Sequence, residues 1–513
     1  MLLIFPPIAK ACEPPAGVAR LAAALNGHHI PCRVLDANLE GQLWLLGRPC
    51  DATDTWSRRA VRNLPANLEA LRDIRTYASI DRYGRAVRDV NRALNVASGG
   101  AGVGLADYRH SRLSPLRSAD LLHCAEHPEL DPFYPWFSRR LGESLDGVAT
   151  VGLSVNYLGQ ALCGFAMAGF IRKHFPGVTI VLGGGLVTSW MSHPGWRNPF
   201  GGLADHLVAG PGEAFLLSLA GVEPEMSRHV RPDYSSLPLA SYLSPGLILP
   251  YSTAGGCYWN RCSFCPERAE GNRYTPVPAS RAMADLHALV AGTRPVLLHL
   301  LDNAVSPALL GALAADPPGS PWYSFARIGP ELADPDFCRA LRRAGCVMLK
   351  LGLESGDQGV LDRLEKGIDL VTASRVLHNL KEAGIGVYLY LLFGTPAETG
   401  AAARRTLEFV ARHAEAVTFL NLALFNMPVN AVETAEYETG PFYDGDLSLY
   451  ADFRHPLGWG RKEVRRFLSH EFTRHPAIAA ILRSDPPLFT SNHAPFFCPS
   501  FVGSPSPGID GTR

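Results

Sequence analysis

The chain has 513 residues, and its 48 lysines and arginines balance its 48 aspartates and glutamates, so the formal net charge is zero at pH 7. This balance gives no support to nucleic-acid binding, while peripheral membrane contact stays open. The length predicts two or three domains. Eleven cysteines without a secreted-scaffold rhythm favour a reducing compartment, so we expect a cytoplasmic protein. The first residues, MLLIFPP, lack the basic flank of a signal peptide, and no stretch predicts a transmembrane segment.

The first half predicts an α/β domain over residues 1–225, built on a doubly wound parallel sheet. Buried strands are expected at 2–7, 32–38, 148–157, 178–184 and 206–210. Helices are expected at 14–30 and 161–175, with an arginine-rich helical insertion at about 51–146. Strands that alternate with helices are typical of a parallel sheet with helices on both faces.

Three loops of this domain are candidates for cofactor binding, because ligands of doubly wound sheets bind beyond the carboxyl ends of the strands. They contain Ser154, Asn156 and Tyr157; Gly183, Gly184 and Gly185; and Gly210, Gly212 and Glu213. Glycine lets a ligand approach the backbone closely. Glycine after a strand is also routine turn chemistry, so plain turns are the alternative.

The second half predicts a partial (β/α)6 barrel over residues 250–431. A proline-rich linker at 226–249 separates it from the first domain. Strands are expected before the cysteine motif and at 295–303, 322–330, 346–355, 386–396 and 417–426, with helices between them. Residues 432–513, rich in aromatic residues and proline, predict a small helical C-terminal cap.

Cys257, Cys262 and Cys265 follow the first of these strands with the spacing CxxxxCxxC. Three thiolates can ligate three corners of a 4Fe-4S cluster and leave one iron open to a substrate. A zinc site or plain core packing is the alternative, although structural zinc takes four ligands and the next cysteine is Cys338. Two further thiols, Cys12 and Cys498, could act near the site, but a core or surface position is the simpler interpretation.

Polar residues at two later strand ends could reach a ligand held there. Asp302, followed by Asn303, ends the strand at 295–303; a helix cap is the alternative role. Arg327 could neutralise a carboxylate bidentately, or it could form a structural ion pair.

The cysteine motif, the phrase LGLESGD continuing to VLDRLEKG, and the phrase FGTPAET together resemble the radical S-adenosylmethionine (SAM) superfamily. The resemblance implies that Glu354 and Ser355 lie near SAM, that Gly394 and Pro396 contact its adenine or methionine part, and that Phe264 packs near the adenine. The usual motif there is CxxxCxxC, so one extra residue must be absorbed by the loop. The resemblance also implies an electron donor such as flavodoxin or ferredoxin.

The element order of residues 1–220 resembles the cobalamin-binding domains fused to the front of many such enzymes, and implies a cobalamin cofactor. The DxHxxG motif that supplies a cobalt ligand in methionine-synthase-like domains is absent, since Asp205 and His206 are adjacent. The implied binding mode has no protein histidine on cobalt.

We therefore expect an enzyme that cleaves SAM reductively and transfers a methyl group to a small specialised metabolite. One alternative is a radical SAM 3-amino-3-carboxypropyl transferase, cyclase or rearrangement enzyme with a vestigial cobalamin domain. An alternative of another class is a zinc-stabilised binding protein. The substrate cannot be read from the motifs, because fold does not determine function.

Overall fold

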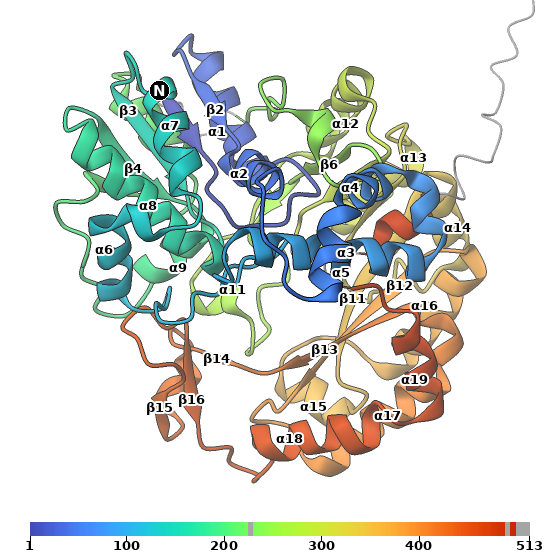
Figure 1. Ribbon diagram of the computed structural model, residues 1–513. Coiled ribbons are helices and arrows are strands. Elements are labelled where there is room, and N and C mark those ends of the chain that lie inside the picture. Colours follow the sequence, from blue (N-terminus) through green and yellow to red (C-terminus); the bar gives the residue numbers. More distant parts are fainter. Residues whose placement is uncertain (224–228, 488–492, 499–513) are drawn as a thin grey trace, which may run out of the picture.

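The structure, a computed structural model, describes residues 1–223, 229–487 and 493–498. It contains two parallel sheets, one of five strands in the order β2-β1-β3-β4-β5 and one of six in the order β13-β12-β11-β10-β9-β6 (Figure 1). The predicted α/β fold class is therefore confirmed. In the described residues no helix is long and apolar enough to cross a membrane.

The five-stranded sheet is doubly wound, because the chain runs from β1 outward to β2 and then returns past β1 to β3. Its strands are β1 (Leu2–Ile4), β2 (Arg33–Leu35), β3 (Thr150–Ser154), β4 (Thr179–Gly183) and β5 (His206–Leu207). The helices around it are α1 (Ala16–Gly27), α2 (Ala37–Leu46), α8 (Leu158–His174), α9 (Gly185–Met191) and α10 (Glu213–Leu219). Helix α8 is buried over Gln160–Ile171, as expected for an all-apolar helix between a sheet and a further layer.

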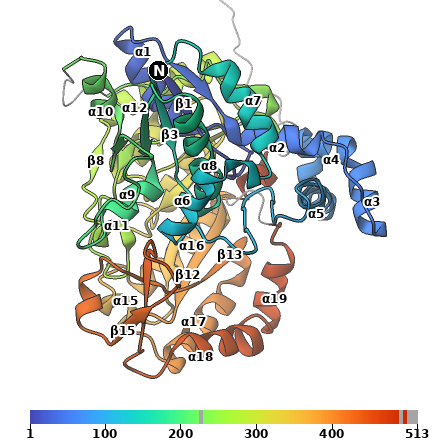
Figure 2. The same cartoon turned by 60° about the vertical axis from the view of Figure 1, so that its left-hand side comes forward.

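A helical segment between α2 and β3 supplies that further layer. It comprises α3 (Thr55–Arg62), α4 (Leu64–Arg72), α5 (Ile80–Ala97), α6 (Ser118–Glu126) and α7 (Tyr134–Ser144). Helices α3 to α5 project to one side of the molecule (Figure 2), whereas α6 lies against α8. A Cβ built on Gly169 of α8 would lie 1.9 Å from the carbonyl oxygen of Ala125, so α6 and α8 touch backbone to backbone.

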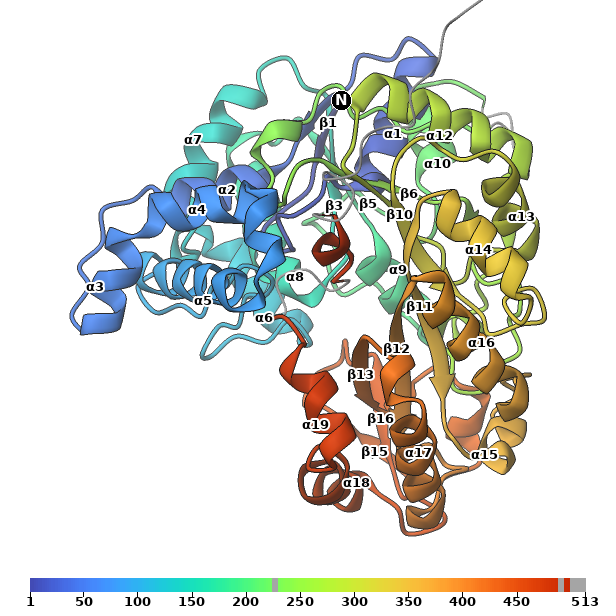
Figure 3. The ribbon, with the colours of Figure 1, turned by 90° about the vertical axis from the view of Figure 1, so that its right-hand side faces the viewer.

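The six-stranded sheet is an open barrel, because its parallel strands follow one another in sequence order and its two outer strands stay unpaired with each other. The strands are β6 (Ile248–Tyr251), β9 (Leu297–Leu300), β10 (Trp322–Ala326), β11 (Cys346–Glu354), β12 (Gly386–Phe393) and β13 (Phe419–Leu424). The connecting helices line its outer side (Figure 3): α12 (Ala279–Thr293), α13 (Pro307–Ala315), α14 (Pro335–Arg343), α15 (Gln358–Arg363), α16 (Leu370–Ala383) and α17 (Gly400–Arg412).

The proline-rich segment between the sheets packs against both of them where it is described. The amide of Asp233 donates to the carbonyl of Ala19 at 3.1 Å, and the hydroxyl of Tyr242 donates to Asp36 at 2.6 Å. Tyr234 is buried and donates to the carbonyl of Pro250. The extended linker expected from composition is thus held in place by buried tyrosines.

The C-terminal region is mostly helical, with α18 (Arg461–Phe467) and α19 (Pro476–Arg483), but it also contains strands that the sequence analysis missed. β14 (Met427–Pro428), β15 (Thr439–Pro441) and β16 (Tyr450–Phe453) form a small antiparallel sheet. The loop between β15 and β16 reaches the first domain, where the amide of Leu447 donates to the carbonyl of Leu116 at 2.9 Å.

Candidate active site

The cysteine loop lies at the carboxyl end of β6, the first strand of the barrel. A short hairpin of β7 (Ala254–Gly255) and β8 (Thr275–Pro276) encloses it. Cys262 is buried, whereas Cys257 and Cys265 are half-buried. Cys265 begins the single-turn helix α11 (Pro266–Ala269), and its amide donates to the carbonyl of Cys262 at 3.2 Å. The three thiols therefore share one loop at the mouth of the barrel.

Two residues at the cysteine loop have left-handed backbone. Asn260 has φ of 42° and Gly256 has φ of 68°, and asparagine and glycine adopt this region most readily. Trp259 anchors the widened turn, because its Nε1 donates to the carbonyl of Glu365 at 3.0 Å. A Cβ on Gly367 would lie 2.1 Å from the Trp259 ring, so the indole needs glycine at that position.

The three cysteine sulfurs do not all lie within 4.8 Å of one another. In the described part of the chain, only His123, Glu126 and His127 bring three potential ligand atoms within 4.8 Å of one another. Tetrahedral zinc with bonds of about 2.3 Å would hold thiolate sulfurs about 3.8 Å apart. At least two of the three sulfurs are therefore farther apart than two ligands of one zinc ion would be.

Cationic side chains stand close to the buried cysteine. Burial raises the pKa of the Cys262 thiol, and the nearby charges of Lys366 and Arg327 lower it. Arg327 also lies with its guanidinium 4.1 Å from the ring centre of Trp259, and it donates to the carbonyl of Lys366. Arg327 thus braces the cysteine loop.

Glu354 ends β11 in a left-handed conformation with φ of 66°, and its Oε1 accepts a hydrogen bond from Nζ of Lys366 at 2.7 Å. The side chains of this ion pair are 12% and 9% exposed. Ser355 points the other way: its hydroxyl lies 3.2 Å from that of Thr406 on α17. The two neighbours predicted to lie near SAM therefore face opposite sides, and only Glu354 faces the cysteine loop's cationic neighbours.

Asp302 is buried and accepts hydrogen bonds from Thr253, at 2.6 Å from its hydroxyl and 3.2 Å from its amide. Burial raises the pKa of this carboxyl, and the bonds to Thr253 lower it. The helix-cap alternative is wrong, because Ser306 caps α13 through a 3.2 Å bond to the amide of Leu309. Asp302 instead fastens the segment that leads into the cysteine loop.

A cavity of about 650 Å³ opens beside the loop, and both Phe264 and Pro396 line it. Gly394, with φ of 81°, turns the chain at the end of β12, and its amide donates to Oε2 of Glu398 at 2.6 Å. Trp459 of the C-terminal region donates to the same oxygen at 2.9 Å. Burial raises the pKa of Glu398 to about 7.

A second cavity, of about 550 Å³, lies at the carboxyl edge of the five-stranded sheet. It is lined by Ser154 and Asn156, by Gly183 to Gly185, and by Gly210, Gly212 and Glu213. All three predicted loops therefore share one cavity. Tyr157 does not line it, and its side chain is exposed. Three lining residues come from the other domain, immediately beyond the cysteines: Glu267, Glu270 and Asn272.

Two glycines that line the cavity pack closely against neighbouring residues. A Cβ on Gly152, inside β3, would lie 2.9 Å from Cδ2 of Leu3, and one on Gly184, with φ of 104°, would lie 2.5 Å from the carbonyl oxygen of Val155. His206 packs on the ring of Phe215 at 5.2 Å, and is not among the residues lining the cavity.

A buried polar cluster, formed by Glu13, His299 and Lys350, was missed by the sequence analysis. Glu13 in the loop after β1 lies 3.0 Å from Nδ1 of His299 on β9, and Nε2 of His299 lies 3.4 Å from Nζ of Lys350 on β11. Burial lowers the pKa of Lys350 to about 7. The sequence signal was present, since a histidine and a lysine interrupt the apolar runs of two strands.

Neither additional thiol lies at the cysteine loop. Cys498 packs with Ile248, Leu297 and Val347, at the amino ends of the barrel strands, whereas the loop is at their carboxyl ends. Cys12 is buried in the loop after β1, and burial raises its pKa to about 12. Both positions agree with the simpler interpretation of these thiols.

Residues 251–410, a range that includes the cysteine loop, match the model of the radical SAM superfamily. The predicted resemblance is thereby confirmed. No curated protein sequence matched the chain.

Among solved structures, the chain is similar to the radical SAM methyltransferase TsrM from Kitasatospora setae with cobalamin and a 4Fe-4S cluster bound. The TM-score is 0.52 and the identity 18%, over 86% of this chain and 77% of that chain. For the structure of TsrM with tryptophan and a SAM analogue bound, the TM-score is 0.53 and the identity 16%, over 98% of this chain and 95% of that chain. For the cobalamin-dependent SAM radical enzyme OxsB, the TM-score is 0.46 and the identity 15%, over 62% of this chain and 57% of that chain. The chain thus shares the fold of TsrM over most of its length.

Proposed function

We propose that this protein is a cobalamin-dependent radical SAM enzyme that transfers a methyl group from SAM to a small molecule. The observation that carries the proposal is the second cavity, which joins the carboxyl edge of the doubly wound sheet to residues Glu267, Glu270 and Asn272 just beyond the cysteine motif. A corrinoid in this cavity would lie beside the cysteine loop.

In this proposal, residues of the barrel bind the cluster and SAM, and residues of the first domain bind cobalamin. Cys257, Cys262 and Cys265 would hold three irons of a 4Fe-4S cluster and leave the fourth to SAM. Phe264 and Pro396 would form the wall for the adenosyl part of SAM in the cavity beside the loop. When bound, the reduced cluster supplies the electron that cleaves a carbon–sulfur bond of SAM, and cobalamin supplies the methyl carrier.

The first domain would hold cobalamin through the shape of the second cavity. The glycines at 183–185 let a ligand approach the backbone, and the side-chain oxygen of Asn156 accepts from the amide of Gly185 at 2.9 Å, which fixes that loop. No DxHxxG motif is present, so we propose binding without a protein histidine on cobalt. A small specialised metabolite is the proposed acceptor, and a flavodoxin or ferredoxin the proposed electron donor.

The test is product analysis of protein reconstituted anaerobically with iron, sulfide and a corrinoid, then incubated with SAM and a strong reductant. We expect bound corrinoid, four irons per cluster, and formation of S-adenosylhomocysteine and 5′-deoxyadenosine. Formation of 5′-deoxyadenosine should be lost in Cys262→Ala and kept in Cys50→Ala, which changes a half-buried cysteine outside the loop.

Three other results would each replace the proposal. Methylthioadenosine as the SAM product would indicate 3-amino-3-carboxypropyl transfer. Turnover of SAM without corrinoid binding would indicate a vestigial cobalamin domain in a cyclase or rearrangement enzyme. Zinc with no iron or sulfide would indicate a zinc-stabilised binding protein.

A further inference from the structure

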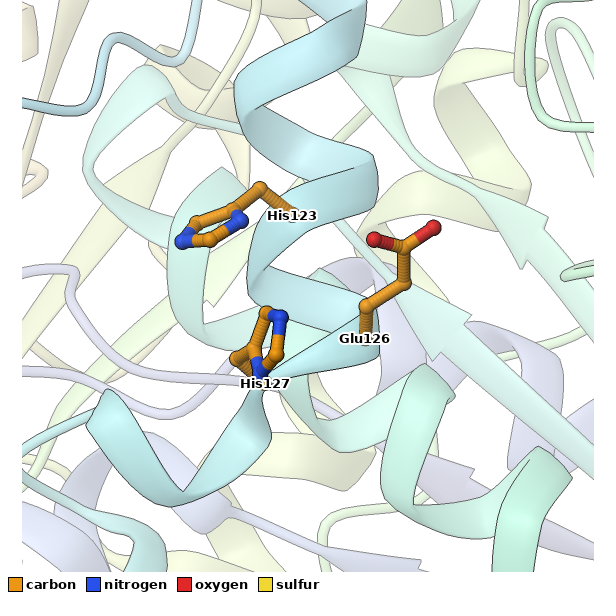
Figure 4. Close-up of side chains that lie close together, drawn as sticks. All are labelled: His123, Glu126 and His127. Carbon is orange, nitrogen blue, oxygen red and sulfur yellow. The ribbon is translucent and has the colours of Figure 1, made fainter.

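A cluster of metal-ligand side chains lies outside both cavities, at the end of helix α6. His123 and Glu126 belong to α6, and His127 is its C-terminal cap (Figure 4). One ligand atom from each of the three lies within 4.8 Å of the others. The rings of the two histidines are 4.7 Å apart between centroids. Residues three and four apart share one face of a helix, which explains the cluster.

The side chains are accessible while their backbone is rigid. His123 is half-buried and Glu126 and His127 are exposed, whereas the intervening Cys124 and Ala125 are buried against α8. Gly169 of α8 approaches Ala125 so closely that a Cβ there would lie 1.9 Å from its carbonyl oxygen. The helix turn that presents the ligands is therefore held by backbone packing, and only the three ligand side chains need to rotate.

The local electrostatics favour a cation. The free carbonyls at a helix C-terminus carry partial negative charge, and the carboxylate of Glu126 adds a full one. Glu129 lies 3.3 Å from Nδ1 of His127, with both side chains about half exposed. A carboxylate on one ring nitrogen of a metal-binding histidine orients the ring and makes the other nitrogen a better ligand.

We propose that His123, Glu126 and His127 form a zinc site, with water in the fourth position. Two imidazoles and one carboxylate form a donor set that zinc accepts in tetrahedral geometry, with bonds of about 2.0–2.2 Å. The site would hold the last turn of α6 together, from His123 to the cap residue His127. It is separate from the cysteine loop and does not depend on the proposed function.

The test is zinc binding to the full chain with its cluster reconstituted, measured anaerobically by competition with a chromophoric chelator. We expect one zinc per chain, with affinity reduced about tenfold or more in both His123→Ala and His127→Ala. Glu126→Gln should weaken binding as well. The matched control is His378→Ala, which removes an exposed histidine on α16.

Cobalt distinguishes this site from the cysteines, because Co²⁺ bound to thiolate has an intense near-ultraviolet charge-transfer band that imidazole and carboxylate ligands do not give. We expect Co²⁺ spectra without that band, and loss of the visible bands in His123→Ala. Zinc affinity unchanged in both histidine variants, a thiolate band in the cobalt spectrum, or no zinc bound would each overturn the proposal. Glu126, His127 and His378 are exposed and His123 is only half-buried, so the variants are expected to fold.

Discussion

His299 and Glu13 join the two parallel sheets through a buried contact: Nδ1 of His299 on β9 lies 3.0 Å from the carboxylate of Glu13 in the loop after β1. Tyr323 stacks on the same imidazole, with ring centroids 4.4 Å apart. Lys350 lies on the far side, 3.4 Å from Nε2. A buried charge needs a nearby opposite charge. The negative charge of Glu13, in the first domain, raises the pKa of Lys350 in the barrel and so opposes the effect of burial.

The first prediction concerns the pH dependence of stability. Burial lowers the pKa of Lys350 from 10.5 to about 7. Between these two values the unfolded chain binds a proton that the folded chain does not, so the free energy of unfolding should rise with pH across this window. Lys350→Met should remove that contribution, which is at most about 1.4 kcal/mol per pH unit.

Thermal melting at several pH values from 7 to 10 measures this effect. Lys462→Met, which alters an exposed lysine on α18, should keep the wild-type slope. Parallel pH profiles for Lys350→Met and wild type would show that Lys350 does not titrate in this window.

The second prediction concerns the ion pair of Glu354 and Lys366 beside the cysteine loop. Because both side chains are largely buried, removing one partner should leave an uncompensated charge that costs about 3–5 kcal/mol. The double variant Glu354→Gln, Lys366→Met should recover much of that loss, which a double-mutant cycle by chemical denaturation detects.

The SAM affinity of the same variants shows whether Glu354 only supports the cysteine loop or also contacts SAM. If Glu354 only supports the loop, the double variant should recover SAM binding together with stability; if Glu354 touches SAM, binding should stay low. The control pair is Lys381 and Glu415, which is exposed and should show coupling of about 0–1 kcal/mol. A buried pair that couples no more than this control would disprove the prediction.

The third prediction concerns the cavity at the edge of the five-stranded sheet. Gly183→Leu should fill it, since a Cβ there meets nothing nearer than 3.5 Å. We expect corrinoid retention to fall about tenfold or more, with melting temperature and iron content unchanged. Gly177→Leu, at an open turn after α8, is the matched control. Equal corrinoid content in both variants would place the corrinoid elsewhere.

The fourth prediction concerns the widened cysteine loop. Trp259→Ala removes the bond to Glu365 and the stacking with Arg327, so the loop should hold its cluster less firmly. We expect lower iron content after desalting and faster bleaching of the cluster absorbance in air. Trp56→Ala, which changes an exposed tryptophan on α3, should behave like wild type. Unchanged bleaching would mean that the loop holds its shape without the indole.

The strand and helix alternation was predictable because most strands of the two parallel sheets are largely apolar runs. The sheet of β14 to β16 was not, since its strands have two to four residues, include Pro428, Gly440 and Pro441, and exist only through pairing. The sequence also could not predict which side chain of a loop lines the cavity. Asn156 and Tyr157 share one loop, yet only Asn156 lines it.

The sequence by itself determined that the three candidate ligands share one loop, because Cys257, Cys262 and Cys265 lie within nine residues. Only the tertiary structure decided that Asp302 holds Thr253, that Ser355 faces α17, and that Glu13 meets His299 from 286 positions away. The reason is physical. A short loop restricts its own geometry, whereas contacts between distant residues depend on how whole sheets and helices pack.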